Sequence, residues 1–353
     1  MMRALTLAVS MALVAQAGLA NAADAKKAGP QYRIQWLLGH KNLDFFEEAA
    51  TNFKKAVEMR SEGRIAVDIV PESSDAAPEA PEIAGKVARG EAQMGHSFTD
   101  VVAPLDPRMN VFEAPYLMRD YTHMEGVLDG PVGQNLLDDM SAHHLTGLSF
   151  TYSGGANGVA SLSRPIRKPE DLKGMKVGVY GDAVNAAWLE SLGAKPVAIA
   201  HDLDKINLLA SQGELDAVVI TWRNFQRTDL DRTFKYFNMP GSTYLVSVTY
   251  VNDKFFASLP KEFQKLIVEE SRRAGRLERA KTIKLNQDSM LGMISKGVKP
   301  VYLSAAGKKA FVAALAPAYE KINGLLGKGF VKKVKSAADG EPEPLIPDKI
   351  ALH

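Results

Sequence analysis

Short segments in which hydrophobic and polar residues alternate are followed, again and again, by longer segments with helical periodicity. Residues 32–37 alternate with period two, whereas residues 43–60 repeat their apolar side chains at the spacing of one helix face. A second alternating segment, residues 64–70, follows a turn at Gly63. Strands that alternate with helices are typical of α/β proteins, and we therefore predict that fold class.

The same pattern starts again after residue 144. We predict strands at residues 145–152, 175–180, 215–220 and 244–252, and helices at residues 183–191 and 202–210. Residues 154–158 are rich in glycine and predict a loop. The 215–220 segment is almost entirely apolar, which indicates a strand buried on both faces.

The longest periodic segment runs from residue 260 to 296 without an internal proline. A helix of this length spans roughly 50 Å, enough to cross two lobes. We predict a strand at residues 298–303, one helix at residues 304–326, and a loose tail from Lys335 onward.

Composition narrows the possible functions. The chain has 353 residues, more than the roughly 250–300 at which one core stops growing, so we expect two lobes. Lys and Arg total 43 and Asp and Glu total 41, and this near-balance gives no reason to expect nucleic acid as a partner. The absence of cysteine excludes disulfides, thiolate metal sites, iron–sulfur clusters and a cysteine nucleophile.

The N-terminus has the features of a signal peptide. Arg3 precedes an uncharged, mostly apolar run over residues 4–20, and Ala20-Asn21-Ala22 matches a small-residue cleavage site. We expect export to the periplasm and removal of residues 1–22. A transmembrane anchor is the alternative, but Gln16 interrupts the run. No later run reaches the roughly 20 apolar residues that cross a bilayer, so we expect a chain that is not embedded in a membrane.

Motifs for catalysis are missing. The sequence contains no Walker A loop, no G-x-S-x-G elbow and no H-E-x-x-H helix. His143 and His144 are adjacent and do not share a helix face, which makes them poor joint metal ligands. We therefore predict neither a cofactor nor a metal, and no enzyme activity. A secreted two-lobed enzyme remains one rival interpretation.

Several sequence blocks occur in a characteristic order. Residues 163–177 are similar to a segment written "RPI-x-x-PEDLKG-x-K", and residues 114–121 with 127–133 are similar to "PFLFRDY…VLDGP-x-G". Further blocks begin at Phe53, Leu192, Gly213 and Leu259. Together the blocks resemble the solute-binding proteins of TRAP transporters, the DctP-like family.

This resemblance implies two α/β lobes of the periplasmic binding protein type, joined by hinge strands and by a long helix that spans both. It implies a receptor that captures a small polar solute between the lobes and delivers it to the small and large membrane subunits of the transporter. Ligand contacts with both lobes would favour the closed form. A sensor subunit that presents the same closed form to a signalling receptor is a further rival.

The resemblance also implies how the chain divides into two lobes and a tail. Residues 23–148 would form lobe 1, completed by about 240–275. Residues 149–236 would form lobe 2, completed by helices over about 276–334. Residues 335–353 would form the tail.

Two positions depart from the family pattern. The family usually has a carboxylate-clamping Arg where this chain has Gly178, and a second Arg upstream falls at Asn157. One interpretation is that the ligand is not a simple organic acid but an amine, an amino alcohol or another non-standard solute. The alternative is a carboxylate or sulfonate ligand with Arg223 as the substitute clamp.

We predict a set of ligand-binding side chains that supply aromatic faces, charge and amide groups. They are Trp222, Arg223, Tyr180, Glu113, Asn157, His96, Asp182 and Trp36. Trp222 follows a strand at its carboxyl end, where open α/β sheets bind ligands. Each also has a structural alternative: Trp36 and His96 as core residues, and Asp182 as a helix cap.

Overall fold

One mixed sheet organises the molecule. The computed structural model describes residues 29–39, 44–70, 80–181, 183–199 and 202–340. Within them the strands follow the order β2-β1-β3-β8-β4-β7-β5-β6, and β9 pairs with β8. The strands are β1 (Tyr32–Leu38), β2 (Ile65–Val70), β3 (Met94–Phe98), β4 (Leu145–Ser161), β5 (Lys176–Val179), β6 (Lys195–Ala198), β7 (Ala217–Thr221), β8 (Tyr236–Asn252) and β9 (Lys299–Tyr302).

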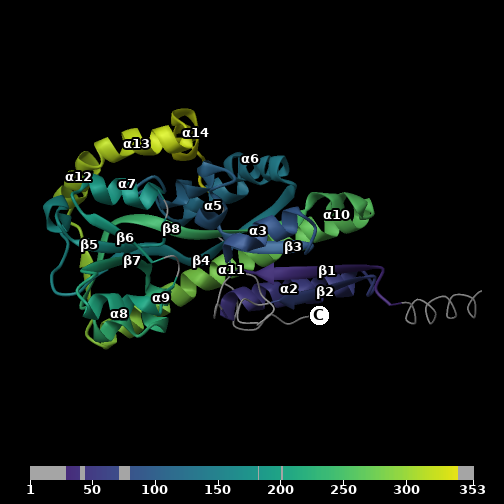
Figure 1. Cartoon of the computed structure of the whole chain (residues 1–353), viewed down its shortest axis with the longest axis horizontal. Helices are drawn as coiled ribbons and strands as arrows, with labels where there is room; N and C mark the ends of the chain where they lie inside the picture. The colour runs from purple at the N-terminus through teal and green to yellow at the C-terminus, as the bar shows by residue number, and fades with distance from the viewer. Residues whose placement is uncertain (1–28, 40–43, 71–79, 182, 200–201, 341–353) are drawn as a thin grey trace, which may run out of the picture.

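Helices cover both faces of this sheet (Figure 1). They are α2 (Asp44–Arg60), α3 (Ala80–Ala88), α4 (Thr99–Val102), α5 (Tyr121–Asp129), α6 (Pro131–Asp139), α7 (Ala183–Ser191), α8 (Lys205–Ser211), α9 (Trp222–Arg227), α10 (Asp253–Ser258), α11 (Lys261–Ser295), α12 (Ala305–Ala314), α13 (Ala316–Leu326) and α14 (Lys328–Lys335). Short 3₁₀ helices include η1 (Pro107–Glu113) and η3 (Pro169–Leu172). The alternation of strands and helices confirms the predicted α/β class.

Two long strands connect the halves of the sheet. β1, β2 and β3 are mutually parallel in one half, and β5, β6 and β7 are parallel in the other. Between them β4 and β8 pair antiparallel along nearly their whole length, so both strands belong to both halves. The 35-residue helix α11 runs along both halves, as its length predicted (Figure 1). This is a two-lobed fold with shared hinge strands, whereas the lobe boundaries given above stay predictions.

Glycines shape β4 where it passes between the halves. The pairing register with β8 shifts between Tyr152 and Gly155, and Gly154 and Gly155 have φ of 121° and 78°. A Cβ on Gly155 would lie 2.5 Å from the Tyr121 hydroxyl, so a larger residue has no room there. The prediction of a glycine-rich loop at residues 154–158 was therefore wrong, because these residues continue the strand through an irregular stretch.

The C-terminal region also differs from expectation. The single helix predicted over residues 304–326 is two helices, α12 and α13, and Pro317 lies in the first turn of the second. A further helix, α14, was not predicted. The tail was expected to be loose from Lys335, but Gly340 donates a backbone hydrogen bond to Thr122 at 2.8 Å. Residues 341–353 lie outside the described part of the chain.

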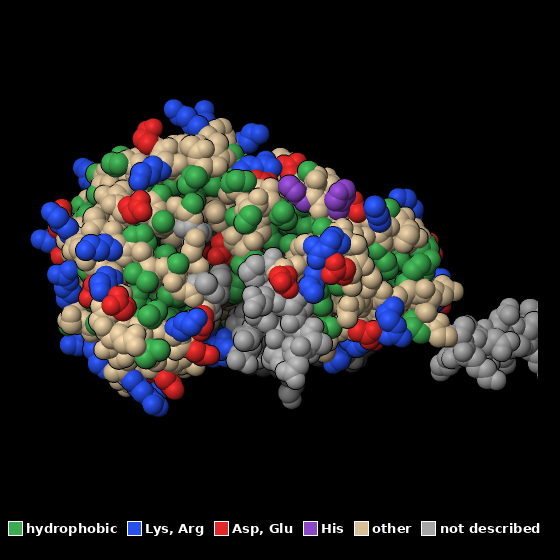
Figure 2. Space-filling view, in the orientation of Figure 1, with side chains coloured by type: hydrophobic (Ala, Val, Ile, Leu, Met, Phe, Trp, Pro, Cys, Tyr) green, Lys and Arg blue, Asp and Glu red, His purple; other side chains and the backbone are tan. Residues whose placement is uncertain are grey.

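Charges of both signs are scattered over the face shown in Figure 2, in keeping with the near-balanced composition. Among the described residues, none of the helices combines the length and the apolar character that a membrane span requires. The predicted signal peptide, residues 1–22, lies outside the described residues.

Candidate ligand-binding site

A buried polar cluster lies where η1, β4, β8 and α7 meet. Glu113, the last residue of η1, is 2% exposed. Its Oε2 accepts a hydrogen bond from the Asn185 amide at 3.0 Å and a long one from the Asn157 amide at 3.5 Å. The Asn157 amide also donates to the Thr243 hydroxyl at 3.1 Å. Two predicted site residues, Glu113 and Asn157, are thus brought together from segments 44 residues apart.

The orientation of Asn185 is set by a neighbouring tryptophan. The Trp188 indole N–H donates to the Asn185 side-chain oxygen at 2.8 Å. Because an indole N–H can only donate, the amide oxygen of Asn185 faces Trp188 and its NH₂ group faces Glu113. α7 therefore presents a donor, rather than an acceptor, to the Glu113 carboxylate.

Tyr180 joins this region from the end of β5. Its side chain is 4% exposed, and burial raises the pKa of its hydroxyl, opposed by a hydrogen bond with Asn224. The negative charges of Glu113 and Asp100 raise the pKa further, so both carboxylates act on this hydroxyl. Tyr180, Asn224 and Asp100 each follow the carboxyl end of a parallel strand, the position at which open α/β sheets bind ligands.

Apolar side chains surround Gly178, the position at which the resemblance led us to expect an Arg. A Cβ built on Gly178 would lie 3.2 Å from Val218, 3.4 Å from Leu215 and 3.5 Å from Ile199. The contact with Val218 is slightly tight and the other two are at ordinary packing distances. Apolar side chains therefore pack next to this part of the backbone.

Trp222 and Arg223 begin α9 but make different contacts. The Trp222 ring stacks on Phe237 with centroids 3.6 Å apart and an interplanar angle of 14°, so one ring face is used in packing. The backbone N–H of Arg223 donates to Asn286 of α11 at 3.1 Å, and its guanidinium donates to Gln226 at 3.4 Å. Their roles as an aromatic wall and a substitute clamp stay predictions.

Two other predicted residues, Trp36 and His96, pack against other parts of the molecule. Trp36 packs edge-on against Phe53 with centroids 5.0 Å apart. The His96 ring nitrogen contacts the Thr151 hydroxyl at 3.0 Å and is fully buried. These contacts favour the structural alternative for Trp36 and His96. Asp182 lies outside the described residues.

Sequence reasoning missed Asn185 and Thr243. Asn185 lies in the first turn of a helix that follows a parallel strand, and this position is a usable signal. Thr243 pairs with Asn157 across the two hinge strands. Its proximity to the site follows from a register that the sequence pattern does not reveal.

A second buried polar network lies at the hinge. Arg279 of α11 binds Glu125 at 2.7 Å, pairs with Asp129, and donates to the Phe150 carbonyl at 3.1 Å. The Tyr152 hydroxyl donates to Glu125 at 2.6 Å. These contacts tie α11 and α5 to the middle of β4.

Glu278 is the neighbour of Arg279 in this network. Its carboxylate accepts the backbone N–H of Tyr152 at 2.7 Å and the Thr282 hydroxyl at 2.6 Å. Burial raises the pKa of the Glu278 carboxyl to about 8, and these hydrogen bonds oppose the shift. The hinge strand is thus held by a carboxyl group that burial shifts toward its protonated form.

Other features do not form a better site. A shallow depression of about 430 Å³ lies between α7 and α13, but alanine, glycine and leucine line most of it. Among the described residues, no group of three His, Asp or Glu side chains is arranged to hold a metal ion. The Glu113 cluster, with its convergent polar groups between the halves of the sheet, is the stronger candidate.

Comparison with known families identifies the type of protein. Residues 39–324 match the model of the DctP family, described as bacterial extracellular solute-binding protein, family 7. The chain belongs to this family. It is accordingly a binding protein of the TRAP type and not an enzyme, and its family is described as extracellular.

Two known solute-binding proteins are similar to this chain at low sequence identity. A solute-binding protein of Verminephrobacter eiseniae is 25% identical over 82% of this chain and 84% of its own length. The 2,3-diketo-L-gulonate-binding periplasmic protein of Escherichia coli is also 25% identical, with the same shares covered. These matches support a solute receptor, but their identity is too low to carry over a ligand.

Solved TRAP solute-binding proteins share the fold. One from Pseudomonas putida with bound D-glucuronate has a TM-score of 0.75 and 25% identity over 86% of this chain and 97% of its own. One from Ralstonia eutropha with bound (S)-2-acetolactate has a TM-score of 0.77 and 24% identity. The match covers 86% of this chain and 98% of that protein. The predicted family and the two-lobed fold are therefore confirmed.

Proposed function

We propose that this receptor captures a small polar solute carrying an amino group, hydroxyl groups or both, and delivers it to the membrane subunits of a TRAP transporter. The observation that supports this most strongly is the cluster of Glu113, Asn157 and Asn185 between the two halves of the sheet. Its carboxylate and amide groups suit the recognition of ammonium, hydroxyl and amide groups.

The chemistry at the two family Arg positions supports the same ligand class. The backbone at Gly178 is surrounded by apolar side chains, and Asn157 offers an amide where the family usually offers a guanidinium. A buried carboxylate ligand without a paired cation would be unfavourable by several kcal/mol. A solute with an ammonium group would instead benefit from the carboxylates of Glu113 and Asp100, which both act on Tyr180.

One observation favours a second candidate, an organic-acid ligand. Arg223 lies in the first turn of α9, directly after the carboxyl end of β7, where ligands of α/β sheets bind. Relatives with solved structures hold organic acids, as the D-glucuronate complex illustrates. Arg223 would then have to reach the ligand in place of the missing Arg.

A binding screen separates the two candidates. Thermal shifts would be measured with amines, amino alcohols, neutral polyols, carboxylates and sulfonates, followed by calorimetry on the best ligand. For an amine or amino alcohol, Glu113→Gln should weaken binding by about ten- to a hundredfold, because a charge-assisted hydrogen bond is lost. Glu320→Gln, on the exposed side of α13, is the matched control and should leave binding unchanged.

The opposite pattern would reject the proposed ligand class. If only carboxylates or sulfonates shift the melting temperature, and Glu113→Gln binds them as well as the original chain does, the organic-acid candidate is correct. With either class of ligand, the bound solute should be recovered unchanged after release.

A further inference from the structure

The C-terminal end of the chain bridges the two halves of the molecule. The match to the family ends at residue 324, but the described chain continues through α14 to Gly340. We infer that residues 327–340, which we call the C-terminal strap, act as a latch that favours the closed arrangement of the lobes. This inference is independent of the class of ligand.

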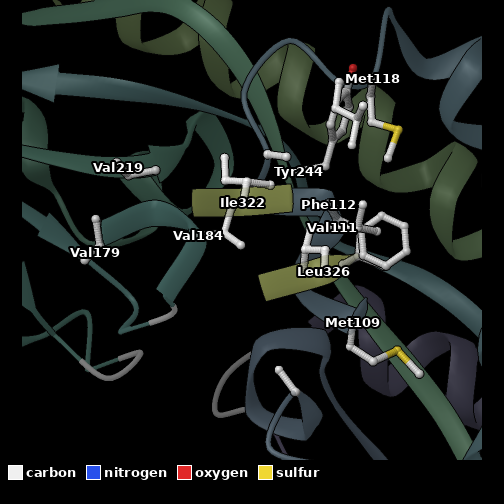
Figure 3. Packing of buried hydrophobic residues seen from close by; sticks show 14 of the residues in the cluster. Met109, Val111, Phe112, Met118, Val179, Val184, Val219, Tyr244, Ile322 and Leu326 are labelled. Carbon is white, nitrogen blue, oxygen red and sulfur yellow. The ribbon is translucent and has the colours of Figure 1, made fainter. Parts of the chain in front are cut away.

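The strap starts from the half of the sheet that contains β5 to β7. The preceding helix, α13, lies along α7, and Ile322 and Leu326 point toward Val184 of α7 and toward η1 (Figure 3). Lys321 pairs with Glu190 of α7 at 3.2 Å. These contacts anchor the start of the strap.

The strap ends on α5. The backbone N–H of Arg119 donates to Nδ1 of His123 at 3.2 Å, so the ring proton is on Nε2. Nε2 then donates to the Val334 carbonyl of α14 at 3.2 Å. The Arg119 guanidinium donates to the Lys335 carbonyl at 3.3 Å and pairs with Asp339. The strap is thus held by specific hydrogen bonds as well as by burial of Val334.

α5 is connected to the other half of the sheet through α6. α6 follows it after one residue, and a Cβ on Gly147 of β4 would lie 2.7 Å from the Leu137 backbone of α6. Gly147 pairs with Tyr250, and Tyr250 pairs with Gly95 of β3. The strap therefore connects a helix of the β5–β7 half with α5, which α6 joins to the β1–β3 half.

Gly126 provides the space on α5 for the strap. A Cβ on this residue would lie 2.0 Å from the Ala338 carbonyl oxygen and 2.6 Å from the Gly340 nitrogen. Glycine inside a helix lowers the stability of that helix relative to alanine. The close approach of the strap gives a reason for glycine at this position. Gly324 in α13 offers a matched comparison, because a Cβ there meets no atom within 4 Å.

The test measures the arrangement of the lobes without added ligand. Because the chain has no cysteine, Lys55→Cys on α2 and Gln212→Cys after α8 allow specific spin labelling, and both sites are exposed. Pulsed electron paramagnetic resonance then reports the distance between the lobes. Gly126→Ala should raise the ratio of long to short distances about tenfold, as expected when two or three hydrogen bonds of the closed form are lost. Gly324→Ala should leave the ratio unchanged.

A second variant tests the same inference in case the first variant misfolds. Arg119→Gln combined with Asp339→Asn removes the exposed part of the latch without adding a side-chain clash, and should shift the distances in the same direction. An unchanged distribution in this variant, a shift to shorter distances, or an equal shift in the Gly324→Ala control would overturn the latch. None of these results depends on Glu113 or on the ligand, so the proposed function is judged separately.

Discussion

Two buried polar regions lie between the halves of the molecule, and they are built from different groups. At the hinge, Arg279 binds two carboxylates and a backbone carbonyl, so charge is balanced by charge within the protein. In the candidate site, neutral amides of Asn157 and Asn185 donate to Glu113. Hydrogen bonds from neutral amides are exchanged for ligand contacts at less cost than the separation of a buried ion pair.

The difference indicates that the two regions have different roles. The hinge network ties α11, α5 and β4 together with partners that all belong to the chain. The candidate site combines residues of η1, the hinge strands and α7, and their polar groups suit a guest that enters and leaves. The comparison predicts that hinge substitutions affect stability first and that site substitutions affect binding first.

The largest effect should follow from breaking the hinge ion pair. Arg279→Met leaves Glu125 buried without its cation, which should lower the free energy of unfolding by about 3–5 kcal/mol in urea denaturation. Arg272→Met on the exposed side of α11 is the control and should change it by less than about 0.5 kcal/mol. A loss below about 1 kcal/mol for Arg279→Met would mean that the network does not hold the hinge.

A smaller, pH-dependent effect should follow at Glu278. Its pKa in the folded chain, about 8, lies above the ordinary value of 4.5, because burial disfavours the ionised form. The contribution of this group to stability is therefore complete below pH 4.5 and is lost as the pH rises through 8. Glu278→Gln removes the titration, and we expect it to be more stable than the original chain at pH 9 by a few kcal/mol, because each unit of pKa shift corresponds to about 1.4 kcal/mol.

Unfolding curves at pH 5, 7 and 9 measure this difference. Glutamine keeps the shape of the side chain, and the Thr282 hydroxyl can turn to accept from the new amide. Glu320→Gln on the exposed side of α13 should show the same pH dependence as the original chain. A Glu278→Gln variant that loses stability in parallel with the original chain would show that another group titrates.

Local sequence patterns correctly predicted the elements whose hydrophobic periodicity lies within one continuous segment. α7 runs from Ala183 to Ser191 as predicted, and α11 differs by one residue at each end. The patterns failed at Gly154 and Gly155, which read locally as a loop. These glycines leave room for the hydroxyls of Thr221 and Tyr121, and residues distant in sequence supply those hydroxyls.

The candidate site was predicted only in part, again because contacts between residues distant in sequence position some of its side chains. Glu113, Asn157 and Tyr180 were predicted from their chemistry and their positions, and the structure brings them to one region. Asn185 was missed because an asparagine in a first helical turn resembles an ordinary solvated residue. Its role depends on Trp188, which turns the amide toward Glu113 and is recognised only when the hydrogen bonds are known.

The smallest effect is expected at Arg223, and it is the sharpest test of the comparison. If the site uses neutral and acidic groups, Arg223→Lys keeps the charge and disturbs contacts within the protein, such as the 3.4 Å hydrogen bond to Gln226. The dissociation constant of the best ligand, measured by calorimetry, should then change by less than about threefold. If Arg223 instead clamps a carboxylate, the loss of its planar fork should weaken binding by about tenfold or more. That larger loss, together with an unaffected Glu113→Gln variant, would mean that this site balances charge with charge as the hinge does, and the distinction between the two regions would fail.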